Sequence, residues 1–122
     1  MRIVIDTGVL WHPMAMDKIA EQKCKLILPI VAYSERLRQL TIAGRKPREL
    51  MILLQALGIE VEPLDMSEVE KYSIRIPNDS WEELARDSYI AGHVGDADLL
   101  WTTNPKDFLE IGVPEHQVVV VP

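Results

Sequence analysis

The chain has 122 residues, 48% of them apolar, and its 13 basic residues stand against 19 acidic ones for a formal charge of −6. This is the length of one domain, and at this size roughly 68% of the unfolded surface can be buried. The acidic balance argues against a protein that coats nucleic acid through a basic surface, although acids that hold metal ions also make a sequence acidic.

The cysteine content indicates a reducing compartment, and the short apolar runs argue against a membrane helix. Cys24 is the single cysteine, so the sequence offers neither a disulfide framework nor a cysteine-based zinc site. No apolar run approaches the ~20 residues of a membrane helix, and the start of the sequence lacks the apolar stretch and cleavage site of a signal peptide. We therefore expect a cytoplasmic protein with no membrane contact.

Predicted strands and helices alternate along the chain, separated by turn residues and helix caps. In chain order they are a strand at 2–5, a helix at 13–22, a strand at 26–28, helices at 30–43 and 47–57, a strand at 59–61, helices at about 66–74 and 79–94, a strand at 98–102, a helix at 104–110 and a strand at 117–121.

The predicted strands are short and continuously apolar rather than alternating. Such strands are typical of parallel sheets that helices cover on both faces, and the alternation of strands with helices indicates the same architecture. Right-handed crossovers then place the helices in two layers. We predict an α/β fold, a three-layer sandwich around a five-stranded parallel sheet, with residues 1–122 as a single domain.

Acidic residues near the carboxyl ends of the strands are the first candidates for a site, because open parallel sheets bind ligands beyond those ends. Asp6 follows the first strand directly, although an N-cap of the next helix would also explain an aspartate there. Glu35 lies one to two turns into the helix after the second strand. It is four residues after Val31, so it either borders the buried face of that helix or lies on its surface.

Asp87 is more informative, because it lies in the middle of a predicted helix, where aspartate is unfavourable. Leu84 precedes it by three residues and Ala91 follows it by four, so Asp87 lies on or near the apolar face of that helix. A carboxylate there is costly unless it is paired or binds a metal. A metal ion, or a salt bridge with Arg86 or Lys71, would satisfy it.

Two further polar residues follow the fourth strand in the segment TTNPKDF. Asn104 stands before a proline, in a position suited to capping a short helix, and Asp107 is an acid of that helix's first turn. Carboxylates gathered at one sheet edge repel one another unless a cation intervenes, and such oxygen-rich sites suit Mg²⁺ or Mn²⁺. The acids that can share this edge are Asp6, Glu35, Asp87 and Asp107.

Four segments carry the strongest sequence signal. They are IVIDTGVL near the start, AYSERL after the second strand, RDSYIAGHV in the late helix, and LLWTTNPKDF. In this order, over nearly the whole chain, they resemble PIN-domain proteins, the family that includes the toxin ribonucleases of toxin–antitoxin pairs. The opening Asp-Thr and the late Thr-x-Asn-x-x-Asp-Phe are moderately specific together.

The resemblance implies a metal-dependent endoribonuclease whose core acids are Asp6, Glu35 and Asp87, with Asn104 or Asp107 at the fourth acidic position. These residues would hold Mg²⁺ or Mn²⁺, which lowers the pKa of a bound water and so produces the nucleophile. Neighbouring hydroxyls would bind the scissile phosphate or the acids: Thr7, Thr102 and Thr103.

The resemblance also implies RNA, a second copy of the chain and a small antitoxin as partners, since such toxins are usually homodimers whose acidic site an antitoxin covers. The apolar helix RELMILLQAL and Trp81 would offer a partner surface, though burial in the core explains most of them. A group of basic residues is a candidate contact for RNA, or an ordinary solvated helix face and turn: Arg36, Arg38, Arg45, Lys46 and Arg48.

Two departures from the family pattern keep open a non-enzymatic alternative, a PIN-like module that binds RNA or protein. Gly8 stands where members usually carry Ser or Asn, and Asn104 is neutral where many have aspartate. Other chemistries fit less well. A phosphoacceptor domain needs paired acids after the first strand and a lysine after the last, and His12, His93 and His116 lack the spacing of a zinc hydrolase.

Overall fold

The computed structural model describes residues 1–121, which contain five strands and six α-helices. The strands are β1 (Arg2–Ile5), β2 (Lys25–Pro29), β3 (Ile59–Glu62), β4 (Leu99–Thr102) and β5 (Val118–Val120). The helices are α1 (Pro13–Glu21), α2 (Ile30–Ile42), α3 (Pro47–Leu57), α4 (Met66–Ser73), α5 (Trp81–Gly92) and α6 (Lys106–Glu110). Short 3₁₀ helices are η1 (Thr7–Trp11), η2 (Asn78–Ser80) and η3 (Glu115–Gln117). No helix in the described range is long and apolar enough to cross a membrane.

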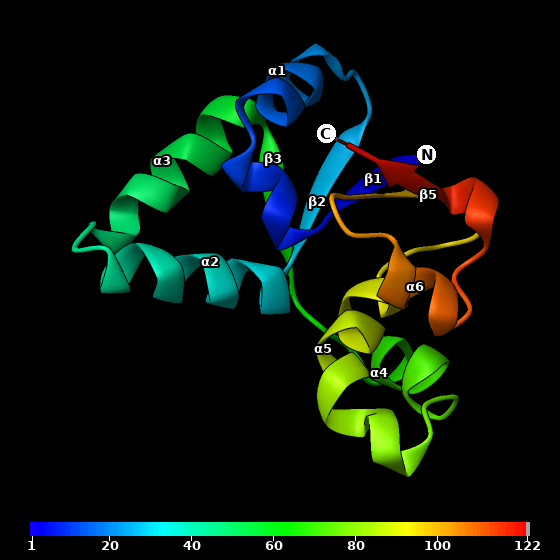
Figure 1. Ribbon diagram of the computed structural model, residues 1–122. Coiled ribbons are helices and arrows are strands. Elements are labelled where there is room, and N and C mark those ends of the chain that lie inside the picture. The colour runs from blue at the N-terminus through cyan, green and yellow to red at the C-terminus, as the bar shows by residue number, and fades with distance from the viewer. Residues whose placement is uncertain (122) are drawn as a thin grey trace.

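All strands of the sheet are parallel, in the order β3-β2-β1-β4-β5. Helices α1, α2 and α3 lie on one side of the sheet, and α4, α5 and α6 lie on the other (Figure 1). The predicted three-layer α/β sandwich is therefore confirmed. The chain moves outward from β1 to β3 and then returns to pair β4 with β1, so the connections that leave β1 and β4 run to opposite faces of the sheet.

The centre of the sheet is the centre of the core. Val4 and Ile5 of β1 have no exposed surface, and neither have Leu28 of β2 and Leu100 of β4. Helices on both faces account for these continuous apolar runs, since every side chain of a central strand needs an apolar environment. This packing determines where β1 ends and therefore where Asp6, the polar residue that follows it, is placed.

Two predicted helix boundaries differ from the structure. Residues 78–80 form η2 and α5 ends at Gly92, so that helix is shorter than predicted. Asn104 does not cap α6, which begins at Lys106, and the cap position makes no side-chain hydrogen bond.

A glycine allows α4 and α5 to lie in close contact. A Cβ at Gly92 would overlap the backbone carbonyl oxygen of Glu68. Backbone of a packed helix cannot move aside as a flexible side chain can, so the contact depends on the absence of a side chain. It also brings the end of α5 against the first turn of α4.

Gly92→Ala should lower the free energy of unfolding by about 1–3 kcal/mol, because the added methyl would force the two helices apart. The sign is informative, since alanine in place of glycine ordinarily stabilises a helix. Urea unfolding followed by circular dichroism measures the change as a lower midpoint. An equal or higher midpoint would contradict the close approach of α4 to α5.

Candidate functional site

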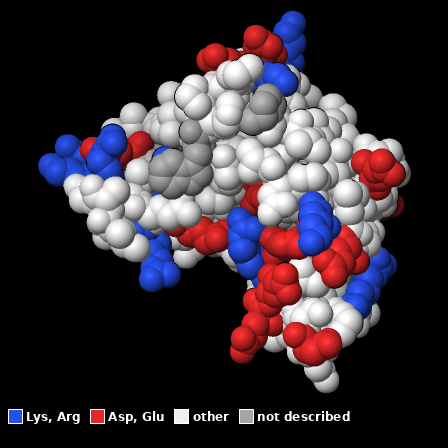
Figure 2. Space-filling model, viewed as in Figure 1, with Lys and Arg blue, Asp and Glu red and all other residues white. Residues whose placement is uncertain are grey.

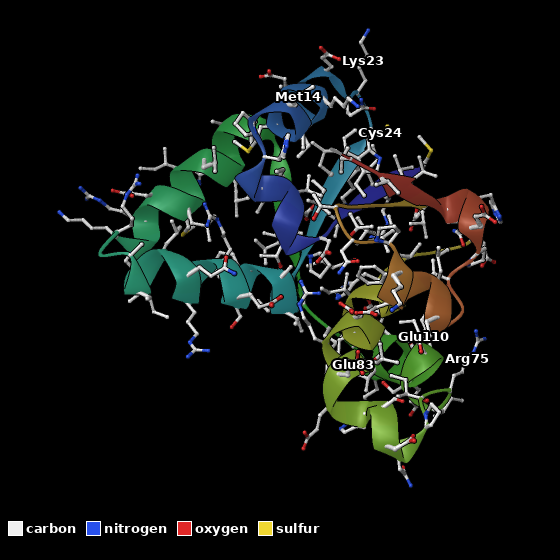
Figure 3. The ribbon with its side chains drawn as sticks, viewed as in Figure 1. Met14, Lys23, Cys24, Arg75, Glu83 and Glu110 are labelled. Carbon is white, nitrogen blue, oxygen red and sulfur yellow. The ribbon has the colours of Figure 1, made fainter. Side chains whose placement is uncertain are left out.

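The strand order reverses between β1 and β4, and parallel α/β sheets bind ligands beyond the carboxyl ends of the strands at such switch points. Asp6 is the first residue after β1, and Thr102 is the last residue of β4. The first half of α2 approaches this point from one layer and α5 from the other (Figure 1). Figure 3 shows polar side chains crowded in this region.

Asp6 is fixed by hydrogen bonds at both of its carboxylate oxygens. Its Oδ1 accepts the Thr7 N–H at 2.8 Å, as the N-cap of η1. Its Oδ2 accepts the Thr102 hydroxyl at 2.9 Å. Asp6 is buried, so it caps a helix and lies in the strand-end crevice at once.

Glu35 and Asp87 reach the same place from opposite layers of the fold. Glu35 of α2 is half-buried, and its Oε1 accepts the Thr7 hydroxyl at 3.1 Å. Asp87 of α5 is 6% exposed and shares the buried face of the helix with Leu84 and Ala91, as the sequence pattern predicts. Acids from three distant parts of the chain therefore meet beyond the end of β1.

Arg86 of α5 connects the three carboxylates. Its Nη2 lies 2.7 Å from Asp6 Oδ1, its Nε lies 2.5 Å from Glu35 Oε1, and its Nη1 binds Asp87 Oδ1. The salt bridge that the sequence suggests for Asp87 is present, but it extends to all three acids. Adjacent helical residues face different directions, so the sequence pattern did not indicate that Arg86 would bridge all three acids.

The electrostatics of the cluster show a shortage of positive charge. Burial raises the pKa of Asp87 to about 6; the Arg86 guanidinium opposes this rise, whereas the charges of Asp6 and Asp107 add to it. For Arg86, burial acts to lower the pKa, but the carboxylates of Asp6 and Glu35 outweigh it and raise the pKa. Three carboxylates thus share the Arg86 guanidinium, and a fourth acid, Asp107, adds to the negative charge around Asp87.

The other predicted residues lie around this cluster in different ways. The hydroxyls of Thr7 and Thr102 bind acids, and the Thr102 oxygen also accepts the Asn104 N–H at 3.0 Å. Thr103 and Asn104 are exposed, so their side chains are accessible to a ligand. Asp107, in the first turn of α6, acts electrostatically on Asp87.

Gly8 leaves room for Thr103 beside η1. A Cβ at position 8 would lie 2.5 Å from Thr103 Oγ1. A serine or asparagine at this position would therefore compete with Thr103 for the same space. Gly8 has no side-chain hydroxyl, but the Thr103 hydroxyl from the segment after β4 occupies the space beside it.

The donor set of the acidic cluster fits a hard divalent cation. Its carboxylates and neighbouring hydroxyls are all oxygen donors, as Mg²⁺ and Mn²⁺ prefer. A metal ion there would replace contacts that Arg86 now makes, because both cations seek the same oxygens. A second group that could hold a metal ion has its ligand atoms within 4.8 Å of one another and lies elsewhere in the fold: Glu62, Glu68 and His93.

The raised pKa of Asp87 predicts a pH dependence of stability in metal-free protein. The folded state takes up this proton near pH 6, whereas the unfolded chain does so near pH 4. The stabilisation is therefore fully present below about pH 4 and is lost as the pH rises through about 6. Asp87→Asn removes the titration, so the variant should gain stability relative to wild type as the pH rises over this range. Urea unfolding of both proteins in EDTA measures the difference, and a difference independent of pH would contradict the shift.

Comparison with known proteins bears on the fold. No family model and no curated protein matches the chain, whereas nine chains of solved structures do. One of them comes from a structure described as a toxin–antitoxin complex from Klebsiella pneumoniae. It has a TM-score of 0.70 and 17% sequence identity, over 97% of this chain and 96% of that chain. The two chains share a fold across the whole domain, and the chemistry of the site has to be argued from its residues.

Proposed function

We propose that this protein is an Mg²⁺- or Mn²⁺-dependent endoribonuclease of the PIN type, active in the cytoplasm as the toxin of a toxin–antitoxin pair. The observation that carries the proposal is the convergence of Asp6, Glu35 and Asp87 at the switch point of a parallel sheet. The fold shared with a chain of a toxin–antitoxin complex supports the same proposal.

In the proposed mechanism, three acids would hold the cation: Asp6, Glu35 and Asp87. Asp107 and Asn104 would lie beside it, with Asp107 supplying the negative charge that the neutral Asn104 does not. When bound, the cation supplies an activated water and stabilises the charge that develops on the phosphate. The protein's own part is to keep charged oxygens together at one point, where their electrostatic effect is available without reorganisation.

The threonine hydroxyls divide the positioning work. Thr7 donates to Glu35 and Thr102 donates to Asp6, so each hydroxyl fixes the orientation of one acid. Carboxylates held in this way lose little further freedom when they bind a ligand. Thr103 is exposed beside the cluster, and we assign its hydroxyl to the scissile phosphate.

RNA would approach over a basic region at the α2–α3 end of the molecule, where Lys and Arg side chains gather (Figure 2). Such a local patch is needed because the chain is acidic as a whole, and its phosphate contacts would make binding weaken with salt. Arg36 lies near Arg45 in this part of the fold, but it is 8% exposed, so its side chain is not part of the basic surface. The exposed basic residues there are Arg38, Arg45, Lys46 and Arg48.

An antitoxin and a second copy of the chain are the proposed protein partners. The apolar helix α3 is divided between core and surface: Leu50 and Leu54 are buried, whereas Met51 and Ile52 are exposed. Trp81 at the start of α5 is also partly exposed. A groove between α2, α3 and β3 lies next to the exposed side of α3, which makes this face the candidate for protein contact.

One observation favours the alternative, a PIN-like module that binds RNA or protein with little or no turnover. Arg86 already binds each of the three acids, so the cluster is held together without a metal ion. The two candidates differ in whether this guanidinium gives way to a divalent cation.

Asp6→Asn should lower the rate of Mg²⁺-dependent RNA cleavage by at least about 100-fold, because a charged ligand at the centre of the cluster is lost. Asparagine keeps the size of the side chain and one acceptor oxygen, so the fold should remain. Cleavage of a structured and an unstructured RNA, with Mg²⁺ and with EDTA, measures the effect.

Asp17→Asn is the matched control, because Asp17 is exposed on α1 and outside the cluster. Its activity should equal that of the wild type. Retained activity in Asp6→Asn, or an equal loss in both variants, would refute the assignment. Absence of cleavage in the wild type, despite RNA binding, would favour the alternative.

Arg86→Gln should bind Mn²⁺ at least about tenfold more tightly than wild type, because the guanidinium no longer competes for the carboxylate oxygens and the three acids are left without a counter-charge. Isothermal titration calorimetry measures this without any cleavage assay. Arg48→Gln, exposed on α3, is the control and should bind as the wild type does. Equal or weaker binding by Arg86→Gln would mean that the guanidinium and the metal do not exchange.

A further inference from the structure

A second cluster of metal-ligating side chains lies apart from the strand-end acids. Glu62 is the last residue of β3, Glu68 lies in the first turn of α4, and His93 follows the last residue of α5. The Oε2 atoms of both glutamates lie 2.8 Å from the same atom, His93 Nδ1. The imidazole side chain is 0% exposed, so three elements of the fold meet at one buried nitrogen.

A single ring nitrogen cannot serve two carboxylates. A neutral imidazole carries at most one proton on Nδ1, which makes one good hydrogen bond. The other nitrogen of His93, Nε2, is buried and has no hydrogen-bond partner among residues 1–121. The polar contacts of this buried ring are therefore concentrated at Nδ1. A single N–H there cannot make a good hydrogen bond to both carboxylates.

The charges around the cluster do not supply what is missing. Arg2 binds Glu62 and Asp98, so one guanidinium serves two carboxylates, and Glu68 lies as a further carboxylate beside the imidazole. Lys71, one turn after Glu68 in α4, donates to the carbonyl oxygen of Val94 instead. Like charges placed this close repel unless a cation lies between them. A metal-binding imidazole is neutral, so Arg2 leaves the carboxylates of this group with unbalanced negative charge that a divalent ion would offset.

Each glutamate has one oxygen fixed by the protein and the other turned to the histidine. Glu62 Oε1 accepts from Arg2 Nη1 at 2.8 Å. Glu68 Oε1 accepts the Asp65 N–H at 3.4 Å, as part of the capping box of α4. Outer contacts of this kind hold ligands in position for a metal ion. The Oε2 atoms of the two glutamates and the ring nitrogen of His93 thus form a preorganised set of three metal-donor atoms.

We infer that Glu62, Glu68 and His93 form a binding site for a divalent transition-metal ion, with zinc as the preferred ion. One imidazole nitrogen and two carboxylate oxygens suit zinc and its neighbours better than Mg²⁺, which favours oxygen alone. The glutamate side chains are 27% and 17% exposed, so an ion can enter and water can complete its coordination. The bound ion ties β3, α4 and α5 together where Gly92 brings the two helices into contact.

Zinc titration of the Asp6→Asn protein, followed by calorimetry, tests this site without a contribution from the intact acidic cluster. We expect one zinc ion per chain and a rise in Tm on binding, since the ion binds only the folded state. Glu68→Gln keeps the acceptor oxygen of the capping box but removes the charge, so in the same background it should weaken zinc binding at least about tenfold.

Glu60→Gln is the matched control, because Glu60 lies on the same strand but is exposed and paired with Lys25; it should bind zinc as its parent does. Co²⁺ offers a second measurement, since its visible absorption reports a nitrogen-containing, low-coordinate site and should be lost in Glu68→Gln. No zinc binding by the Asp6→Asn protein, or equal affinity in Glu68→Gln and Glu60→Gln, would overturn the proposal.

Discussion

The carboxylate of Asp6 is the fixed point of the acidic cluster. Its position along the chain is set by β1, because Val4 and Ile5 are buried in the core and Asp6 is the next residue. Its two oxygens accept hydrogen bonds from the Thr102 hydroxyl of β4 and from the first N–H of η1. The acids of α2 and α5 belong to separate layers, and they meet because each layer packs against the strand that carries Asp6.

Charge balance is the second constraint on the acidic cluster at the strand ends. At the strand ends, one guanidinium binds three carboxylates, and burial still leaves the pKa of Asp87 raised. Buried ion pairs of this kind seldom add much net stability, because desolvation offsets their attraction. A site that stability alone does not explain is a candidate for function. The nuclease hypothesis rests on this point as much as on the shared fold.

The sequence predicted the fold and the meeting of the acids, because both follow from patterns that the chain carries locally. Continuous apolar strands indicate a parallel sheet, and parallel strands bring the residues that follow them to one edge. It did not predict the part of Arg86, which depends on how α5 is rotated against α2. Nor did it indicate the cluster at His93, since that cluster arises where α4 and α5 touch at Gly92. The apolar period of a helix shows which face is buried, but not which other helix that face meets.

The two clusters lie at different levels of one helix, with Asp87 in the middle of α5 and His93 just after its end. The first has a guanidinium at its centre, whereas the second has only a histidine nitrogen between two glutamates. Their donor sets also differ, because oxygen donors favour Mg²⁺ or Mn²⁺ and a nitrogen donor favours zinc. An ion at the second cluster would hold α5 against α4 and β3, and would thereby fix the helix that presents Asp87 and Arg86 to the strand ends. A metal ion at the His93 cluster would then stabilise the arrangement of the acidic cluster without taking part in its chemistry.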